Sequence, residues 1–473
     1  MRKPILNAAG LSLLLLVAGC SAASNGFGEA VSESADTTGT ANGTAGAQLN
    51  DLSVLYPLAT SSAQMDAYLK ATSATAGGPL LPLALFNTVT GASTKTTGAT
   101  EGLTDSAGIN AGVDGGDAST EDAGADGGVA NIDAGSDTVS DPGSMNVGLV
   151  PGASPQLVYS DLRAVAFRLD PCFANIGPVT DPSSCQNQIR VIFQSLTFSD
   201  GSATAVDGAV HVFFSLTRAE FVAAVNEVIA ARQASDPSGA DLGPLAVHPL
   251  LARQGLGGKM TKALNKIVLK YASSANILRL TQFLAGNLDT DWSFSGINVA
   301  KGKATPMDIA SLASGTTSET FALGFGAFLS EGEYLPGTKS SDNMQILANS
   351  MLASAATPAV QRAAFDSALR VQSPDFDSPN TIDCASCHTA QFAQVVVGQN
   401  MLGLSASGPY SFVPNPSYVP AGDTLATTPV TATTAFNLHA FSYSGSNPMI
   451  NQRVMNETEA LVAYVNGEVL QAQ

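Results

Sequence analysis

The stretch Gln188–Phe198, "QIRVIFQSLTF", decides the fold. Apolar and polar residues alternate along it, and its apolar residues are β-branched or aromatic, a combination that is typical of a β-strand. The runs "LRAVAFRLD" (162–170) and "GAVHVFFSLT" (208–217) have the same pattern. Hairpin-length connections outnumber helical crossovers in this region, so we expect the strands to form an antiparallel sheet.

Helical patterns follow these strands. The run 218–232, "RAEFVAAVNEVIAAR", has apolar residues at helical spacing directly after Thr217, a residue that favours helix starts. A second helix is predicted over 257–272, and the pattern returns to strand over 275–286 and 291–300. We therefore predict an α+β domain.

The predicted α+β domain covers 146–374 and contains an antiparallel sheet. A short ordered segment, 51–96, precedes it in the chain. Helical signals resume over 342–356 and 358–370.

The composition sets limits on the partners. The chain has 473 residues, enough for two or three domains. Its formal net charge is -18. A phosphate backbone would be repelled by this charge, so we do not expect nucleic acid as a partner.

Much of the acidic charge lies in residues 97–145, where Asp, Gly and Ala recur as in "VDGGDASTEDAGADGG". A calcium site is one interpretation, but no stretch matches the ligand spacing of an EF-hand loop. A composition without large apolar residues cannot bury a core. We therefore expect a solvated low-complexity insertion without bound calcium.

The N-terminus carries a targeting signal. Arg2 and Lys3 precede an apolar run that is too short to span a bilayer comfortably. The run ends in "VAGC", which resembles the lipobox of bacterial lipoproteins. The resemblance implies a signal peptide over 1–19 and a lipid on Cys20. Residues 20–50 contain mainly Ser, Gly, Ala, Thr and Asn with few large apolar side chains, so we expect a flexible tether there.

The residue after the lipobox bears on localisation. Ser21 stands where inner-membrane retention usually requires Asp, so the resemblance favours an outer-membrane lipoprotein that faces the periplasm or the cell surface. The alternative is an ordinary signal peptide in which Cys20 is incidental.

Cys172 and Cys185 flank a loop rich in Pro, Gly, Ser and Asp. In an oxidising compartment we expect them to form a disulfide, with a stabilisation on the order of 3 kcal/mol for so short a loop. A metal site is the alternative, but it lacks nearby histidines.

The last two cysteines lie in "TIDCASCHT" (381–389). Cys384 and Cys387 are three residues apart, and His388 directly follows Cys387. On a helix these three residues share one face. A redox dithiol would need an exposed Cys pair, usually beside a strand. A zinc site would need further ligands, and only three other histidines remain in the chain.

The spacing Cys-x-x-Cys-His resembles the haem-attachment motif of c-type cytochromes. The resemblance implies one covalent haem c, held by thioether bonds to Cys384 and Cys387, with His388 as the proximal iron ligand. It also implies a small, mostly helical, class I cytochrome-like domain over 375–473. In that family the distal methionine precedes the closing helix, which makes Met449 in "GSNPMINQR" the first candidate and His439 the alternative.

The sequence therefore predicts a lipid-anchored c-type cytochrome that transfers one electron at a time to a redox partner that it does not identify. We expect an electron carrier rather than a catalyst. One rival is a haem enzyme subunit of the peroxidase or oxidase type, although a two-haem peroxidase would need a second attachment motif. The other rival is a non-redox binding lipoprotein with a structural Cys pair.

Overall fold

The computed structural model describes residues 46–97, 157–172, 186–285, 291–307, 318–322, 347, 350–376, 384–406, 408, 410–411 and 440–471. The predicted signal peptide with Cys20, the acidic segment beyond Thr97, Cys185 and His439 lie outside these residues. The described residues belong to one compact unit that spans 45–473. In that part of the chain no helix is long and apolar enough to cross a membrane.

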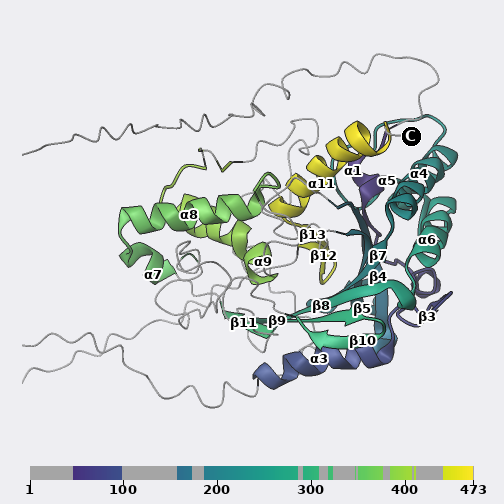
Figure 1. The fold of residues 1–473 in the computed structure, drawn as a ribbon, viewed down its shortest axis with the longest axis horizontal. Helices are drawn as coiled ribbons and strands as arrows, with labels where there is room; N and C mark the ends of the chain where they lie inside the picture. The colour runs from purple at the N-terminus through teal and green to yellow at the C-terminus, as the bar shows by residue number, and fades with distance from the viewer. Residues whose placement is uncertain are drawn as a thin grey trace, which may run out of the picture. The chain divides into compact units, whose positions relative to one another are not determined.

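The main element of the fold is a nine-stranded sheet in which every strand pairing is antiparallel. Its central path runs in the order β1-β4-β5-β7-β8-β9-β10, with β6 paired to β5 and β11 paired to β9 (Figure 1). The strands are β1 (Ser53–Leu55), β4 (Leu162–Asp170), β5 (Asn187–Ser199), β6 (Ser202–Ala205), β7 (Gly208–Leu216), β8 (Ile277–Ala285), β9 (Asp291–Ala300), β10 (Lys303–Pro306) and β11 (Ser318–Ala322). The predicted α+β class with an antiparallel sheet is confirmed.

The other elements are helices, short helical turns and two small hairpins. The hairpins are β2–β3 (Ala74–Thr75, Gly78–Pro79) and β12–β13 (Phe441–Ser444, Asn447–Ile450). The helices are α1 (Leu49–Leu52), α2 (Ser62–Met65), α3 (Leu83–Thr97), α4 (Arg218–Ser235), α5 (Pro249–Gln254), α6 (Lys259–Tyr271), α7 (Ser350–Ala355), α8 (Pro358–Gln372), α9 (Cys384–Phe392) and α11 (Gln452–Tyr464). The remaining turns are 3₁₀ helices at Tyr159–Asp161 and Ser274–Asn276, and π-helices at Ala393–Met401 and Val465–Val469.

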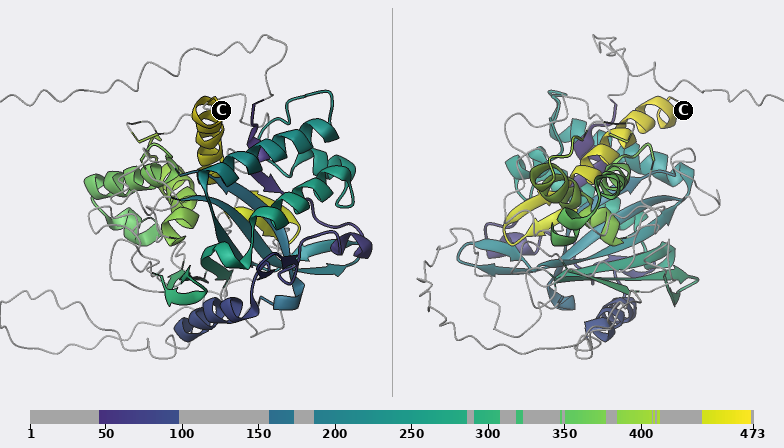
Figure 2. Two further views of the ribbon diagram at one scale, coloured as in Figure 1. Left: turned by 45° about the vertical axis from the view of Figure 1, so that its right-hand side comes forward. Right: turned by 90° about the vertical axis from the view of Figure 1, so that its left-hand side faces the viewer.

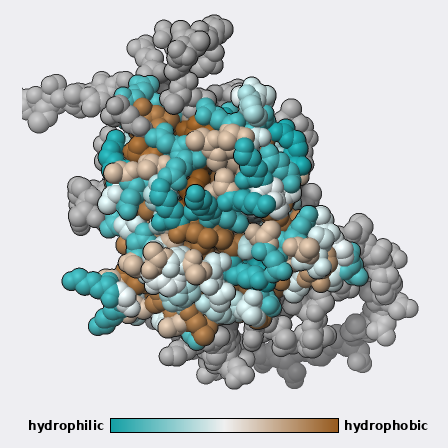
Figure 3. Space-filling view, turned by 90° about the vertical axis from the view of Figure 1, so that its right-hand side faces the viewer, coloured by the Kyte–Doolittle hydropathy of each residue, from teal (hydrophilic) through white to brown (hydrophobic). Residues whose placement is uncertain are grey.

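One face of the sheet is apolar and packs against helices. Val191 of β5 and Val212 of β7 join Phe221 of α4 and Leu264 of α6 in the first hydrophobic cluster. Helix α4 begins at the predicted cap, where the Thr217 side chain accepts a hydrogen bond from the Glu220 backbone N–H. Hydrophilic residues alternate with smaller hydrophobic areas on the side of the molecule that includes α4 and α6 (Figure 3).

Order begins earlier than the predicted tether allows. Ala47 and Leu49 are buried in the first cluster, and α1 contacts α11 near the other end of the chain. A tether that starts at Cys20 would therefore end before residue 47 rather than at residue 50.

The C-terminal helices share their apolar contacts with the sheet. Phe365 of α8 and Phe392 of α9 form a second hydrophobic cluster with Phe283 and Trp292 of strands β8 and β9. Helix α11 contacts α8 and α9 but places its apolar side chains in the first cluster (Figure 2). The predicted domain boundary at residue 374 therefore does not coincide with a break in packing.

Helix α9 continues as a π-helix, and a glycine allows that segment to approach α8. A Cβ atom on Gly398 would lie 2.2 Å from Cδ2 of the buried Phe365 ring. Only glycine fits so close an approach without a shift of its neighbours. The helix that carries the motif thus begins at Cys384, and Gly398 sets the distance between its continuation and α8.

Candidate functional site

Helix α9 brings together the three residues of the Cys-x-x-Cys-His motif. Cys384, Cys387 and His388 lie within its first five residues and are each half-buried. Neither Cys384 nor Cys387 is joined in a disulfide. At helical spacing the three side chains project from one face. The motif is therefore held on a regular helix, as its spacing predicts.

The ring of His388 lies against aromatic side chains of the sheet. It stacks on Phe283 with ring centroids 5.1 Å apart and an interplanar angle of 17°. It meets Phe294 at 5.3 Å with an interplanar angle of 60°. These strand residues stand directly opposite each other in the β8–β9 pairing, so they belong to the same face of the sheet.

The residues of α9 fit the donor set of a covalent haem. Two half-buried cysteines that form no disulfide could supply the thioether sulfurs, and one imidazole follows directly. Stacking covers a face of the His388 ring, whereas metal ligation uses a nitrogen lone pair in the ring plane. The Phe283 contact therefore leaves ligation possible. Across the described ranges no three His, Cys, Asp or Glu side chains converge as a metal-ion site.

The N-terminus of α11 touches the motif helix. Asn451 caps α11, because its side-chain oxygen accepts a hydrogen bond from Val454 N at 2.9 Å. Its amide nitrogen donates to the carbonyl oxygen of Cys387 at 3.3 Å. Helix α11 begins at Gln452, so Asn456 lies one turn inside it.

The next turn of α11 holds the end of α8. Arg453 donates through Nη1 to the carbonyl oxygens of Val371 at 2.8 Å and Ser373 at 3.2 Å. Asn456 donates to the carbonyl oxygen of Gln372 at 2.8 Å. The last carbonyls of a helix lack partners within it, so these side chains satisfy the C-terminus of α8.

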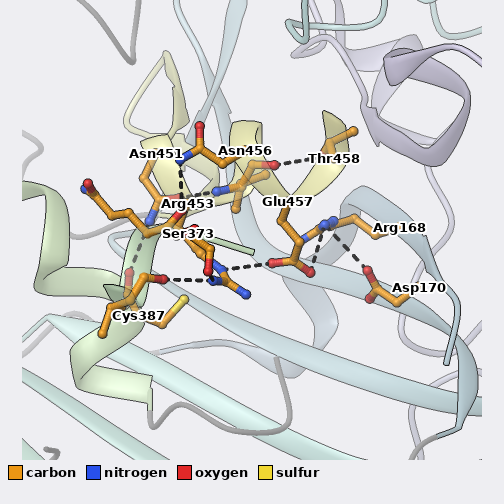
Figure 4. A network of polar contacts seen from close by, with 12 residues as sticks. Arg168, Asp170, Ser373, Cys387, Asn451, Arg453, Asn456, Glu457 and Thr458 are labelled. Carbon is orange, nitrogen blue, oxygen red and sulfur yellow. Dashed lines mark hydrogen bonds and ion pairs between the residues drawn. The ribbon is translucent and has the colours of Figure 1, made fainter. Parts of the chain in front are cut away.

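A buried chain of charges links α11 to the sheet (Figure 4). Glu457 lies 3.3 Å from Arg168 of β4 and 3.3 Å from Arg453. Arg168 also lies 3.5 Å from Asp170, which pairs with Arg190 of β5 at 2.8 Å. The side chains of Arg168 and Arg453 are each only 2% exposed.

The environment of Glu457 keeps it ionised. Burial alone would raise the pKa of this carboxyl, but the positive charges of Arg168 and Arg453 outweigh burial and hold its pKa below the ordinary 4.5. An ionised carboxylate between two buried guanidinium groups offsets their desolvation. Arg168 and Arg453 therefore keep their shared ion-pair partner only while Glu457 is ionised.

The first candidate for the distal ligand lies on a strand. Met449 belongs to β13, which directly precedes α11, and it pairs with Ser442. The hairpin forms because Phe441 and Ile450, opposite each other, are buried in the first cluster. Met449 itself is half-buried and lies two residues before Asn451, whereas His439 is outside the described residues.

Cys172 lies directly after β4 and is disulfide-bonded. Its expected partner, Cys185, is outside the described residues, so the pairing of these two cysteines stays a prediction.

Sequence reasoning missed the charged residues beside the motif. Arg168, Arg190 and Arg279 each stand inside an apolar strand run, at positions where alternation places the side chain on the face opposite the apolar core. That arrangement was the available signal, because a charged residue in such a run is rarely buried without a partner. The sequence around Glu457 contains several polar residues, so one more acidic residue there did not indicate a buried charge.

Comparison with family models, with curated proteins and with solved structures gave no match to this chain.

Replacement of Glu457 by Gln would leave Arg168 and Arg453 without their shared carboxylate. We expect the free energy of unfolding at pH 7 to fall by about 3–5 kcal/mol, the usual effect of breaking a buried ion pair. Urea unfolding of both proteins measures it. The control is Glu468→Gln, an exposed residue after the same helix, which should change stability by less than about 0.5 kcal/mol.

The same variant gives a pH test. Because the folded-state pKa of Glu457 is below 4.5, its charge contributes stability above pH 4.5, and that contribution is lost as the pH falls through the lower folded-state value. The stability difference between wild type and variant should therefore shrink below pH 4.5. Equal stability of the two proteins at pH 7 would contradict this account of the charge chain.

Proposed function

We propose that this chain is a lipid-anchored c-type cytochrome that carries single electrons through one covalently bound haem. The observation that carries the proposal is the spacing of Cys384 and Cys387, which lie one helical turn apart on α9, form no disulfide and are directly followed by His388. When bound, the haem supplies an iron that cycles between the ferrous and ferric states.

The surroundings of the motif support this function. Cys384 and Cys387 would hold the macrocycle through thioether bonds, and His388 would ligate the iron. Phe283 and Phe294 keep the imidazole in an apolar setting, and Asn451 fixes the backbone at Cys387. A ligand ring held from several sides moves little when the iron changes charge, and small structural change suits electron transfer.

Two rivals remain as alternatives. A haem enzyme subunit would need an open iron position, and a binding lipoprotein would use the Cys pair only for structure. In all three cases the α+β sheet serves as the scaffold or as the partner-binding part, and the lipid on Cys20 attaches the chain to the outer membrane.

The first prediction concerns the covalent haem. Full-length protein produced together with haem-attachment machinery should have the mass of the mature chain plus one haem. Replacing both Cys384 and Cys387 with Ser removes the two thioether sulfurs, so the haem mass should disappear. Mass spectrometry of the denatured protein measures the difference.

The matched control is Ser386→Ala, which changes a buried residue between the two cysteines but keeps both thiols and their spacing. It should retain the haem mass. A wild-type chain without haem under these conditions would refute the proposed function.

The distal ligand decides between carrier and enzyme. Met449→Ala should abolish the weak absorbance near the red edge of the spectrum that marks a bond between methionine and ferric haem, and it should lower the reduction potential. If that variant keeps the wild-type spectrum while His439→Ala becomes high-spin, His439 is the ligand. A high-spin wild type would favour the enzyme.

The membrane anchor has its own test. Cys20→Ser removes the acceptor of the lipid, so the chain should leave the membrane fraction or accumulate as an unprocessed precursor. Fractionation followed by immunoblotting measures both. If the variant stays in the membrane fraction at the wild-type level, the lipid is not its anchor.

A further inference from the structure

Three arginines form a line across the sheet on the face that meets α9. Arg168 of β4 stands opposite Arg190 of β5, Arg190 stands opposite Phe213 of β7, and Phe213 stands opposite Arg279 of β8. Opposed residues in antiparallel pairs share one face of a sheet. We call Arg168, Arg190 and Arg279 the arginine row.

The row is fixed by stacking and by ion pairs. The guanidinium groups of Arg190 and Arg279 lie 4.8 Å and 4.9 Å from the centroid of the same Phe213 ring. Cation–π contacts of this kind strengthen when they are shielded from water. Arg168 and Arg190 both pair with Asp170, so the positions of all three positive charges are determined by their neighbours.

The row lies within electrostatic range of the two motif cysteines. Burial lowers the pKa of Arg279 to about 10 with the help of repulsion from Arg190, and the neighbouring Cys384 partly opposes this. Burial also acts to lower the pKa of Arg168, but Glu457 and Asp170 raise it above its ordinary value, with a further contribution from Cys387. Arg279 and Phe283 lie on the same face of β8, and Phe283 stacks on His388, so the row is on the side of the sheet that carries the motif helix.

Four guanidinium groups gather on the side of the sheet that carries the motif helix. In the described part of the chain, two carboxylates, Asp170 and Glu457, form the ion pairs of Arg168, Arg190 and Arg453, and Arg279 adds a fourth guanidinium on the same side of the sheet. Buried charges are screened little by salt. Their field therefore acts on any group attached to the cysteines.

We propose that the arginine row raises the reduction potential of the haem held by Cys384, Cys387 and His388. This inference rests on the proposed function. Ferric haem iron carries one more positive charge than ferrous iron, and it becomes ferrous by taking one electron from a redox partner, with no other bond made or broken. Nearby guanidinium groups repel the ferric form more strongly, so they favour reduction.

Coulomb's law gives the size of the effect. At an effective dielectric constant of about 20, one unit charge about 12 Å from the iron changes the equilibrium constant between the ferric and ferrous states by roughly a factor of ten. For a one-electron couple a factor of ten corresponds to about 59 mV. Arg279 is the residue to test, because its removal leaves every ion pair of the Glu457 chain in place.

The experiment is a redox titration of haem-loaded, full-length protein followed by its visible absorbance. Arg279→Gln removes one charge and should lower the midpoint potential by about 59 mV, a tenfold weaker preference for the ferrous state. Arg279→Lys keeps the charge and should stay close to the wild type. Arg232→Gln is the control, because Arg232 is a buried arginine that pairs with Asp51 on α1 and does not belong to the row; it should leave the potential unchanged.

Arg190→Gln is a second, independent variant if Arg279→Gln does not fold, and it should lower the potential in the same direction. Haem-loaded variants with unchanged or higher potentials would overturn the role of the row while leaving the cytochrome proposal intact. A wild-type chain without haem would instead overturn the proposed function, and this inference with it.

Discussion

The carboxylate of Glu457 lies between the buried guanidinium groups of Arg168 and Arg453, and this contact joins parts of the chain that are far apart in sequence. Arg168 belongs to the sheet, whereas Arg453 holds the last carbonyls of α8. Each group would be costly to bury alone. Sheet, α11 and α8 can therefore pack together only in the arrangement that brings the three charges into contact, and α9 is held in the same arrangement through Asn451.

This arrangement explains how a short motif helix becomes a defined site. Helix α9 has few residues, and isolated helices of that length are marginal in water. It is held on one side by the close approach of Gly398 to Phe365 and on another by the sheet, where His388 stacks on Phe283. The positions of the two thiols and the imidazole thus depend on tertiary contacts more than on helix propensity.

Local patterns predicted the parts of the fold that depend on local physics. Strand β4 has the predicted bounds, β5 and β7 nearly so, and α4 begins directly after Thr217, because alternation and capping are properties of adjacent residues. The hairpin that carries Met449 was not foreseen, because its formation depends on burial of Phe441 and Ile450 against the distant sheet. The arginine row escaped prediction for the same reason, since strand order decides which arginines become neighbours.

The measurement that tests the account most directly is the visible absorption spectrum of the purified full-length protein, recorded in its oxidised and reduced forms after production with haem-attachment machinery. The account predicts an intense Soret band and, on reduction, the sharp, low-spin bands of a six-coordinate c-type haem that stays with the chain after denaturation. A spectrum without a Soret band would contradict it and would leave Cys384, Cys387 and His388 as part of a non-haem site.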